Sequence, residues 1–393
     1  MKKTLAALGV LSALAAGSAL AADVTLYGVL DLGLKYTHIN PDEHGKKSTD
    51  SFTMEPNNQA GSRFGLKGSE ELGNGWTAGF VLENGFAPDN GTMQQNNRLF
   101  GREASLHVAG PYGELAFGRM GMLTSGNGSY GIAGNLSPFG TSWSGYTVEA
   151  STFFVGYSRM DNTITYKSPT IAGFTAYAQH SFDVNSKDDW GDAKLHAENK
   201  ASANRYTALG GTYKNGPLDL VLTADWYNWS NNYQKASPNV KVDDGYAVTL
   251  GGSYDFQVVK AYVGAQYFDH MLHKSNTNPK GGADGYATVG AGIDGPFNGY
   301  GLMAGVSAPL LGGTGMLAVG YTDTEASNKQ DGVKTESTRW GASVGYDYPF
   351  SKRTNVYAVA GYYQDRIDNY AGAKGDDRKP STTAAVIGVR HKF

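Results

Sequence analysis

The chain closes with the stretch STTAAVIGVRHKF, residues 381–393. Ala385, Ile387 and Val389 share one parity, which reaches the final residue, Phe393, whereas Arg390 and Lys392 share the other. A two-residue period predicts a β-strand that has one apolar and one polar face. The last residues of a domain are usually frayed. A strand that ends on an aromatic residue therefore indicates that this end of the chain is fixed within a sheet.

The same alternation recurs along the chain. Three clear examples are VTLYGVLDLGLKY (24–36), PLDLVLTADW (217–226) and WGASVGYDY (340–348). Short connections such as KNGP (214–217) alternate with long polar ones such as 39–59. Between these connections we count about sixteen strands. An even number of strands, with tight turns at one end and long loops at the other, is typical of outer-membrane β-barrels.

We therefore predict an all-β fold, a transmembrane antiparallel β-barrel of about 16 strands. Strands in hydrocarbon must pair every backbone group, so the sheet has to close on itself. At this size the lumen is too wide for side chains to fill, so we expect it to hold water and to be lined by polar residues. A secreted β-sandwich would also alternate, but it would bury the apolar face and would not explain the even spacing of the strands or the terminal Phe393.

Composition excludes several classes of protein. The 393 residues contain no cysteine, so disulfides, iron–sulfur clusters and thiol nucleophiles are impossible. The formal net charge of −3 is too small to indicate a nucleic-acid partner. The 54 glycines show no collagen-like repeat.

Residues 1–21 read as a secretory signal peptide. Lys2 and Lys3 form a positive start, residues 4–16 are apolar, and Ala19–Ala21 offers a small-residue cleavage site. A membrane anchor is the alternative, but a spanning helix needs about 20 apolar residues. We expect the barrel to occupy residues 22–393.

Several ordered blocks resemble one known family, the Gram-negative porins of betaproteobacteria and Neisseria. The blocks are DVTLYGVLDLGL (23–34), GSRFGLKGSEELGNGWTAGFVLENGF (61–86), RLFGREASLHVAG (98–110), YGELAFGR (112–119), DNTITYKSP (161–169) and GVRHKF (388–393). The resemblance implies a homotrimeric diffusion channel in the outer membrane, in contact with lipopolysaccharide and membrane lipid. It implies an inward-folded third loop at about 120–152, and Phe393 resembles the C-terminal signal that the barrel-assembly machinery recognises.

Parity selects the basic residues that would line the pore. Arg63 and Lys67 oppose Phe64 and Leu66, and Arg159 and Lys167 oppose Ile164 and Tyr166, so all four should point inward. The family's RLFGR block adds Arg98 and Arg102. Arg102 shares parity with Leu106, which leaves two explanations open: an irregular strand, or a face that meets a neighbouring subunit. The direction of Arg119, at the start of the predicted third loop, also stays open.

The predicted third loop carries few acids. Its SPFG element, with Pro138 and Phe139, lacks the acid that enteric porins have in Pro-Glu-Phe-Gly, and Glu149 is its only carboxylate. A pore discriminates by its width and by the charges around its narrowest part. We therefore expect weak anion selectivity. The alternative is that the arginines hold the loop by hydrogen bonds and leave selectivity near neutral.

Other motifs carry no chemistry that we can assign. GNGSYG (126–131) fits G-x-G-x-x-G without a βαβ unit, and GASVG (341–345) fits G-x-S-x-G in the middle of a strand. His270 and His273 lack a third metal ligand. We expect no enzyme activity, cofactor or metal. A substrate-specific channel, an outer-membrane hydrolase and an adhesin are the competing functions.

Overall fold

The computed structural model describes residues 24–140, 143, 156, 159–186, 198–231, 242–272, 291–293, 295–329 and 332–393. The predicted signal peptide, Glu149 and His273 lie outside these residues. Within them, no helix is long and apolar enough to cross a membrane.

The described residues form one sheet of seventeen antiparallel strands. Two short 3-10 helices accompany them, η1 (Ala133–Asn135) and η3 (Tyr370–Gly372). The strands are β1 (Thr25–Asn40), β2 (Thr49–Pro56), β3 (Arg63–Gly73), β4 (Trp76–Gly85), β5 (Glu103–Gly110), β6 (Gly113–Gly121), β7 (Arg159–Lys167), β8 (Phe174–Ser181), β9 (Arg205–Asn215), β10 (Leu218–Asn228), β11 (Gly245–Asp255), β12 (Lys260–Met271), β13 (Phe297–Leu310), β14 (Gly313–Ala326), β15 (Glu336–Pro349), β16 (Thr354–Asp368) and β17 (Ser381–Lys392).

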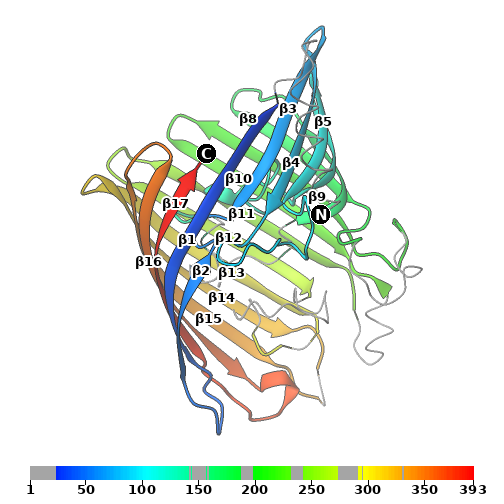
Figure 1. Cartoon of the computed structure of the whole chain (residues 1–393). Helices are drawn as coiled ribbons and strands as arrows, with labels where there is room; N and C mark the ends of the chain where they lie inside the picture. The colour runs from blue at the N-terminus through cyan, green and yellow to red at the C-terminus, as the bar shows by residue number, and fades with distance from the viewer. Residues whose placement is uncertain are drawn as a thin grey trace, which may run out of the picture.

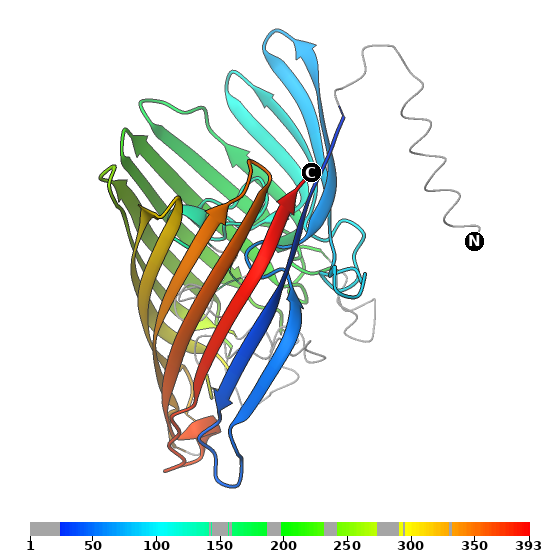
Figure 2. The ribbon, with the colours of Figure 1, turned by 60° about the vertical axis from the view of Figure 1, so that its left-hand side comes forward.

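The sheet closes because β1 pairs with β17 over twelve residues, from Val29↔Lys392 to Asn40↔Ser381. Figures 1 and 2 show β1 and β17 side by side at this seam. β2 and β3 pair with the two halves of β1 and so share one place in the wall. The barrel therefore has sixteen strand positions, which confirms the predicted transmembrane barrel of about 16 strands. The prediction of a loop over 39–59 was wrong, because β1 and β2 extend into it as a hairpin.

Side chains alternate between an exposed apolar face and a buried, mostly polar face. On β10, Leu222 and Trp226 are exposed, whereas Thr223 and Asp225 are buried. On β17, Ile387 is exposed and its neighbour Val386 is buried. The exposed apolar face meets lipid and the opposite face lines the lumen.

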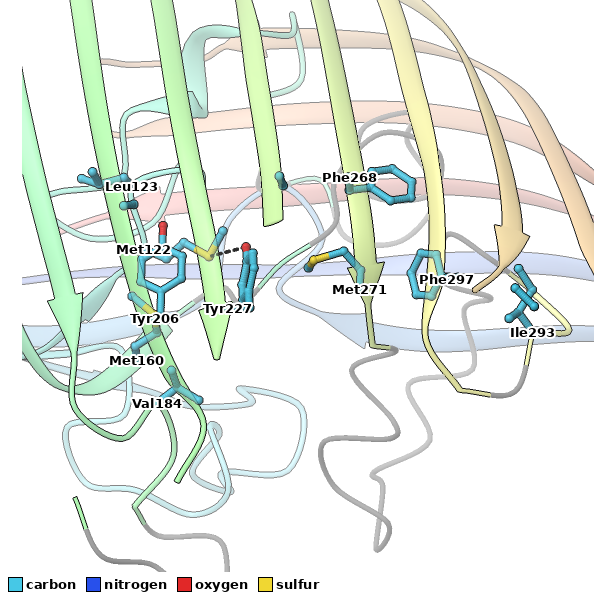
Figure 3. Close-up of a cluster of buried hydrophobic side chains, with 13 residues drawn as sticks. Met122, Leu123, Met160, Val184, Tyr206, Tyr227, Phe268, Met271, Ile293 and Phe297 are labelled. Carbon is cyan, nitrogen blue, oxygen red and sulfur yellow. Dashed lines mark hydrogen bonds between the residues drawn. The ribbon is translucent and has the colours of Figure 1, made fainter. Parts of the chain in front are cut away.

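One part of the inner face is apolar rather than polar. The side chains of Tyr206 on β9, Tyr227 on β10, Phe268 on β12 and Phe297 on β13 are fully buried in one cluster, which also contains Met122. Figure 3 shows these side chains gathered in front of the inner wall, with the Tyr227 hydroxyl 3.9 Å from the Met122 sulfur. The prediction of a polar lining was wrong on this side, because connecting segments fold against the wall and exclude water.

One tryptophan, Trp229, packs against the same cluster. Trp229 stacks on Tyr227 with ring centroids 5.3 Å apart, and its Nε1–H donates to the carbonyl of His270 at 2.8 Å. By contrast, Trp226 and Trp340 are exposed on the outer face.

The terminal Phe393 is fixed to the first strand. Its N–H donates to the carbonyl of Gly28 and its carbonyl accepts from the N–H of Gly28, both at 3.1 Å. Its exposed ring lies over Gly28, where an added Cβ would stand 2.1 Å from the ring atom Cζ. A strand glycine at such a point permits close approach, so Gly28 is the seat of the terminal ring.

Replacing Gly28 by alanine should therefore weaken closure of the seam. The new methyl group would also stand 2.7 Å from the Arg63 carbonyl, which cannot swing away, and overpacking of this kind costs about 1–3 kcal/mol. We expect a smaller fraction of refolded protein that resists SDS without heating. Gly211→Ala is the matched control, since its Cβ would meet neighbours only at 3.6 Å or beyond. If Gly28→Ala and Gly211→Ala refold to the same extent, close contact between Gly28 and the Phe393 ring is not needed for closure of the barrel.

Candidate functional site

The segment that follows β6 lies against the inner wall of the barrel. The Leu123 N–H donates to Gln179 Oε1 on β8 at 3.0 Å. Asn135 Nδ2 donates to Asp219 Oδ2 on β10, also at 3.0 Å. Residues 122–140 thus run along lumen-facing side chains rather than out into solvent.

Small wall residues make room for the far part of this segment. A Cβ at Gly305 on β13 would stand 2.7 Å from Pro138, and one at Gly345 on β15 would stand 2.6 Å from the Phe139 ring. Trp143 packs edge-on against Tyr357 on β16, with ring centroids 5.4 Å apart. The segment therefore reaches from β6 to β16.

Thr124 ties the start of this segment to β10. Its hydroxyl lies 2.5 Å from Asp225 Oδ2 and 2.6 Å from Thr223 Oγ1. The Tyr206 hydroxyl also donates to Asp225, whose carboxylate is buried. Because a buried carboxylate that lacks donors is unfavourable, these bonds hold the segment on the wall.

Thr124→Val should loosen the segment, because it keeps the shape of the side chain and removes one donor to Asp225. The expected loss is about 1–2 kcal/mol of attachment. Single-channel recordings should then show more frequent brief closures. Thr170→Val is the control, since it removes a hydroxyl contact of 2.8 Å to Thr175 in the turn before β8. Unchanged closures in Thr124→Val would mean that this contact does not hold the segment.

Elsewhere on the inner wall, two arginines share one carboxylate. Arg102 Nε lies 2.6 Å from Glu83 Oε1, and Arg63 Nε lies 3.5 Å from Glu83 Oε2. β5 begins only at Glu103, so Arg102 precedes the strand and its side chain is free to turn inward. Of the two explanations left open for Arg102, the structure supports the irregular strand.

Asp161 on β7 holds a second pair of arginines. Arg98 Nη2 lies 2.9 Å from Asp161 Oδ2, and Arg119 Nη1 lies 2.6 Å from Asp161 Oδ1. The direction of Arg119 is therefore inward, where its Nε–H also donates to the carbonyl of Gly101 at 2.8 Å.

Arg159 joins the wall to the inward segment. Its Nε–H donates to the Arg102 carbonyl at 2.9 Å, and its Nη2 donates to Asn127 Oδ1 at 3.0 Å. No carboxylate of the described residues lies within 4.0 Å of its guanidinium group. Its positive charge is thus held by neutral oxygens.

Two further polar contacts fix the inward segment to this wall. Glu103 accepts hydrogen bonds from the Ser129 N–H at 3.0 Å and from the Ser105 hydroxyl at 2.9 Å. Tyr130 donates to Glu114 Oε1 at 2.5 Å. Burial and the adjacent Glu114 carboxylate raise the pKa of Tyr130 well above its ordinary value, so Tyr130 stays a donor.

The structure brings five of the predicted basic residues into one group, which we call the arginine cluster: Arg63, Arg98, Arg102, Arg119 and Arg159. Three carboxylates lie among them: Glu83, Glu103 and Asp161. Five positive and three negative charges leave the cluster at +2.

The two predicted lysines lie apart from the cluster. Lys67 is four residues beyond Arg63 along β3, about 13 Å at the usual strand rise, and its ammonium group is 5.5 Å from the Tyr27 ring centroid. Lys167 is at the end of β7, eight residues or about 26 Å from Arg159. Glu149 lies outside the described residues, so its relation to the cluster is not described.

A closed membrane barrel of this size, with ionised side chains inside its lumen, has the architecture of a channel. The family model described as Gram-negative porin matches residues 4–368, and the chain belongs to this family. It therefore forms a water-filled channel through the outer membrane, down which ions and small hydrophilic solutes diffuse. Members of this family are channels rather than enzymes.

Individual relatives agree with this assignment. The chain is 33% identical to an outer membrane porin protein of Bordetella pertussis and 29% identical to the major outer membrane protein P.IB of Neisseria sicca, each over 100% of both chains. Among solved structures, an anion-selective porin from Comamonas acidovorans matches 95% of this chain and 100% of its own, with 24% identity and a TM-score of 0.66. The trimer form of OmpT from Vibrio cholerae matches the same shares with 16% identity and a TM-score of 0.57.

Proposed function

We propose that this porin prefers anions weakly and that the arginine cluster sets the preference. The observation that supports the proposal is the net charge of +2 on the cluster, on the stretch of inner wall that the segment 122–140 approaches. Charge on outer loops is screened beyond about 8–10 Å at physiological salt. Charge at a constriction acts on every ion that passes.

Ion pairing within the cluster limits the preference. Arg63, Arg98, Arg102 and Arg119 each face a carboxylate, so part of the field is cancelled locally. Arg159 lacks such a partner among the described residues and adds an uncompensated charge. We therefore expect a weak preference rather than exclusion of cations. A solved neighbour described as an anion-selective porin is consistent with it.

The deciding experiment is the reversal potential of the purified channel in a planar bilayer across a tenfold gradient of potassium chloride. The proposal is supported if the reversal potential is shifted toward the equilibrium potential of chloride. A potential near zero would favour arginines that only hold the segment, and the opposite sign would reject the proposal.

The assembly proposed for the channel is a homotrimer, as in the trimer form of the Vibrio neighbour. Insertion of channels that raises the conductance in groups of three equal steps would support the trimer, and insertion in single steps would oppose it.

Phe393 is the residue that we expect the barrel-assembly machinery to recognise, and lipopolysaccharide is the expected partner of the outer loops. The protein needs no enzyme activity for this role. A substrate-specific channel, the competing function, would show flux that saturates with one solute.

A further inference from the structure

A short segment leaves the wall between β2 and β3. β1 pairs with the end of β2 at Leu32↔Pro56 and with the start of β3 at Val29↔Arg63. Between these pairs β1 advances by three residues while its partner advances by seven, so four extra residues are inserted. Residues 57–62, which we call the inserted segment, include these four.

The inserted segment is anchored on the carboxylate of Asp31, which is fully buried on β1. Asp31 Oδ2 accepts from the N–H groups of Gln59 at 2.8 Å and Ala60 at 2.6 Å. Asp31 Oδ1 accepts from the Tyr357 hydroxyl of β16. Charge-assisted bonds of this kind are about twice as strong as neutral ones, so Asp31 fixes the segment firmly.

The side chain of Gln59 extends the segment across the inner wall. Its Nε2 donates to Asp347 on β15 at 2.7 Å, and its Oε1 accepts from Asn355 on β16 at 2.8 Å. The Gln59 side chain therefore spans the inner face of β1 and β17 to reach β15 and β16. Because it bonds the buried, inward side of these strands, the segment lies inside the lumen and thickens the wall there.

One residue, Tyr357, contacts both Asp31, which anchors the inserted segment, and Trp143, which lies beyond the end of the segment 122–140. Tyr357 donates to Asp31 on one side and packs its ring against Trp143 on the other. The anchor of the inserted segment and Trp143 thus meet the wall at the same residue of β16. Between their other ends lies the arginine cluster.

Gly61 connects the inserted segment to that cluster. Its carbonyl accepts from Arg63 Nη1 at 2.8 Å, and an added Cβ would stand 2.4 Å from Arg102 Nη1. Arg63 and Arg102 are the two guanidinium groups that share Glu83. The backbone at Gly61 therefore determines where both of these charges sit.

We propose that the inserted segment is a second constriction element, which narrows the lumen and positions Arg63 and Arg102 at its edge. Asp31 and Gly61 are its positioning residues. The narrowing stands on the geometry alone. The effect on ion preference rests on the proposed anion selectivity.

Deleting Asn58–Gly61 tests the narrowing, because it removes the four extra residues and restores an unbroken strand. We expect single-channel conductance to rise by roughly 1.5- to two-fold, as a wider pore passes more ions. Unchanged or lower conductance in folded protein would overturn the narrowing. Heat-dependent mobility in SDS gels identifies the folded protein.

Gly61→Ala tests whether the inserted segment positions Arg63 and Arg102. It can be measured even if the deletion variant does not fold. Displacing Arg102 by its methyl group should change the anion-to-cation permeability ratio about two-fold while conductance changes little. Gly211→Ala on the lipid side is the control and should match the original protein. An unchanged ratio in a channel that is itself anion-selective would overturn the positioning. If the original channel shows no preference, the proposed function fails, and the deletion still decides the narrowing.

Discussion

Asp365→Ala should lower the free energy of unfolding by about 3–5 kcal/mol, the usual cost of removing one partner of a buried ion pair. Asp365 on β16 accepts two bonds from Arg339 on β15, at 2.5 and 2.7 Å. Their side chains are only 2% and 3% exposed. The Arg339 guanidinium carbon also lies 4.5 Å from the Tyr363 ring centroid. The substitution removes the Asp365 carboxylate from this buried guanidinium group.

Denaturant unfolding in detergent micelles, followed by tryptophan fluorescence, measures this loss. Asp368→Ala on the same strand is the matched control, since its partner Arg366 is 66% exposed and the pair is 3.4 Å apart. Exposed pairs contribute about 0–1 kcal/mol. The double variant Arg339→Met, Asp365→Leu should recover most of the stability, because it removes both charges of this pair. Similar losses in Asp365→Ala and Asp368→Ala would contradict this account.

The alternation of the sequence predicts the barrel because period two is a property of each strand alone. It separates Thr223 and Asp225, which are buried, from Leu222 and Trp226, which face lipid. The same rule places Arg63 and Arg159 on the inner face. Local pattern therefore suffices for the fold and for the direction of residues within regular strands.

Pairing between strands could not be predicted in this way. Parity assigns a face to Asp161 but does not say that Arg98, 63 residues earlier, reaches it. Glu83 and Arg102 meet because Glu83 pairs with Glu103, the neighbour of Arg102, where β4 lies beside β5. Register depends on loop lengths and bulges, which single-sequence patterns do not fix.

The positions of two further parts of the inner wall could not be predicted from the alternation of the sequence. Residues 57–59 read as the end of the predicted connection 39–59, and only the pairing of β1 with both β2 and β3 shows that residues 57–62 turn inward. Arg390 lies on the polar parity of β17, where its Nε–H donates to Asn355 at 2.9 Å. The sequence carries its direction, but its place beside the inserted segment follows from the register of β16 and β17.

The second large effect concerns the size of the net positive charge on the arginine cluster. Arg159→Ala lowers the cluster from +2 to +1, whereas Asp161→Asn raises it to +3. One unit charge about 7 Å from a passing ion in water changes its energy by about 0.6 kcal/mol, which is roughly a three-fold change in local concentration. Because the local concentrations of anions and cations change in opposite directions, the anion-to-cation permeability ratio should fall about seven-fold in Arg159→Ala and rise about seven-fold in Asp161→Asn.

Reversal potentials of both variants, recorded with the original protein in the same salt gradient, measure these shifts. Lys46→Ala removes the same charge as Arg159→Ala from the exposed connection between β1 and β2, where Lys46 pairs with Glu43 at 2.7 Å. Because solvent and salt screen that site, its permeability ratio should stay near the original value. Opposite shifts for the two cluster variants can arise only if passing ions sense the field of these side chains. Shifts of one sign in both, or an equal shift in Lys46→Ala, would mean that the cluster holds the inward segment but does not select ions.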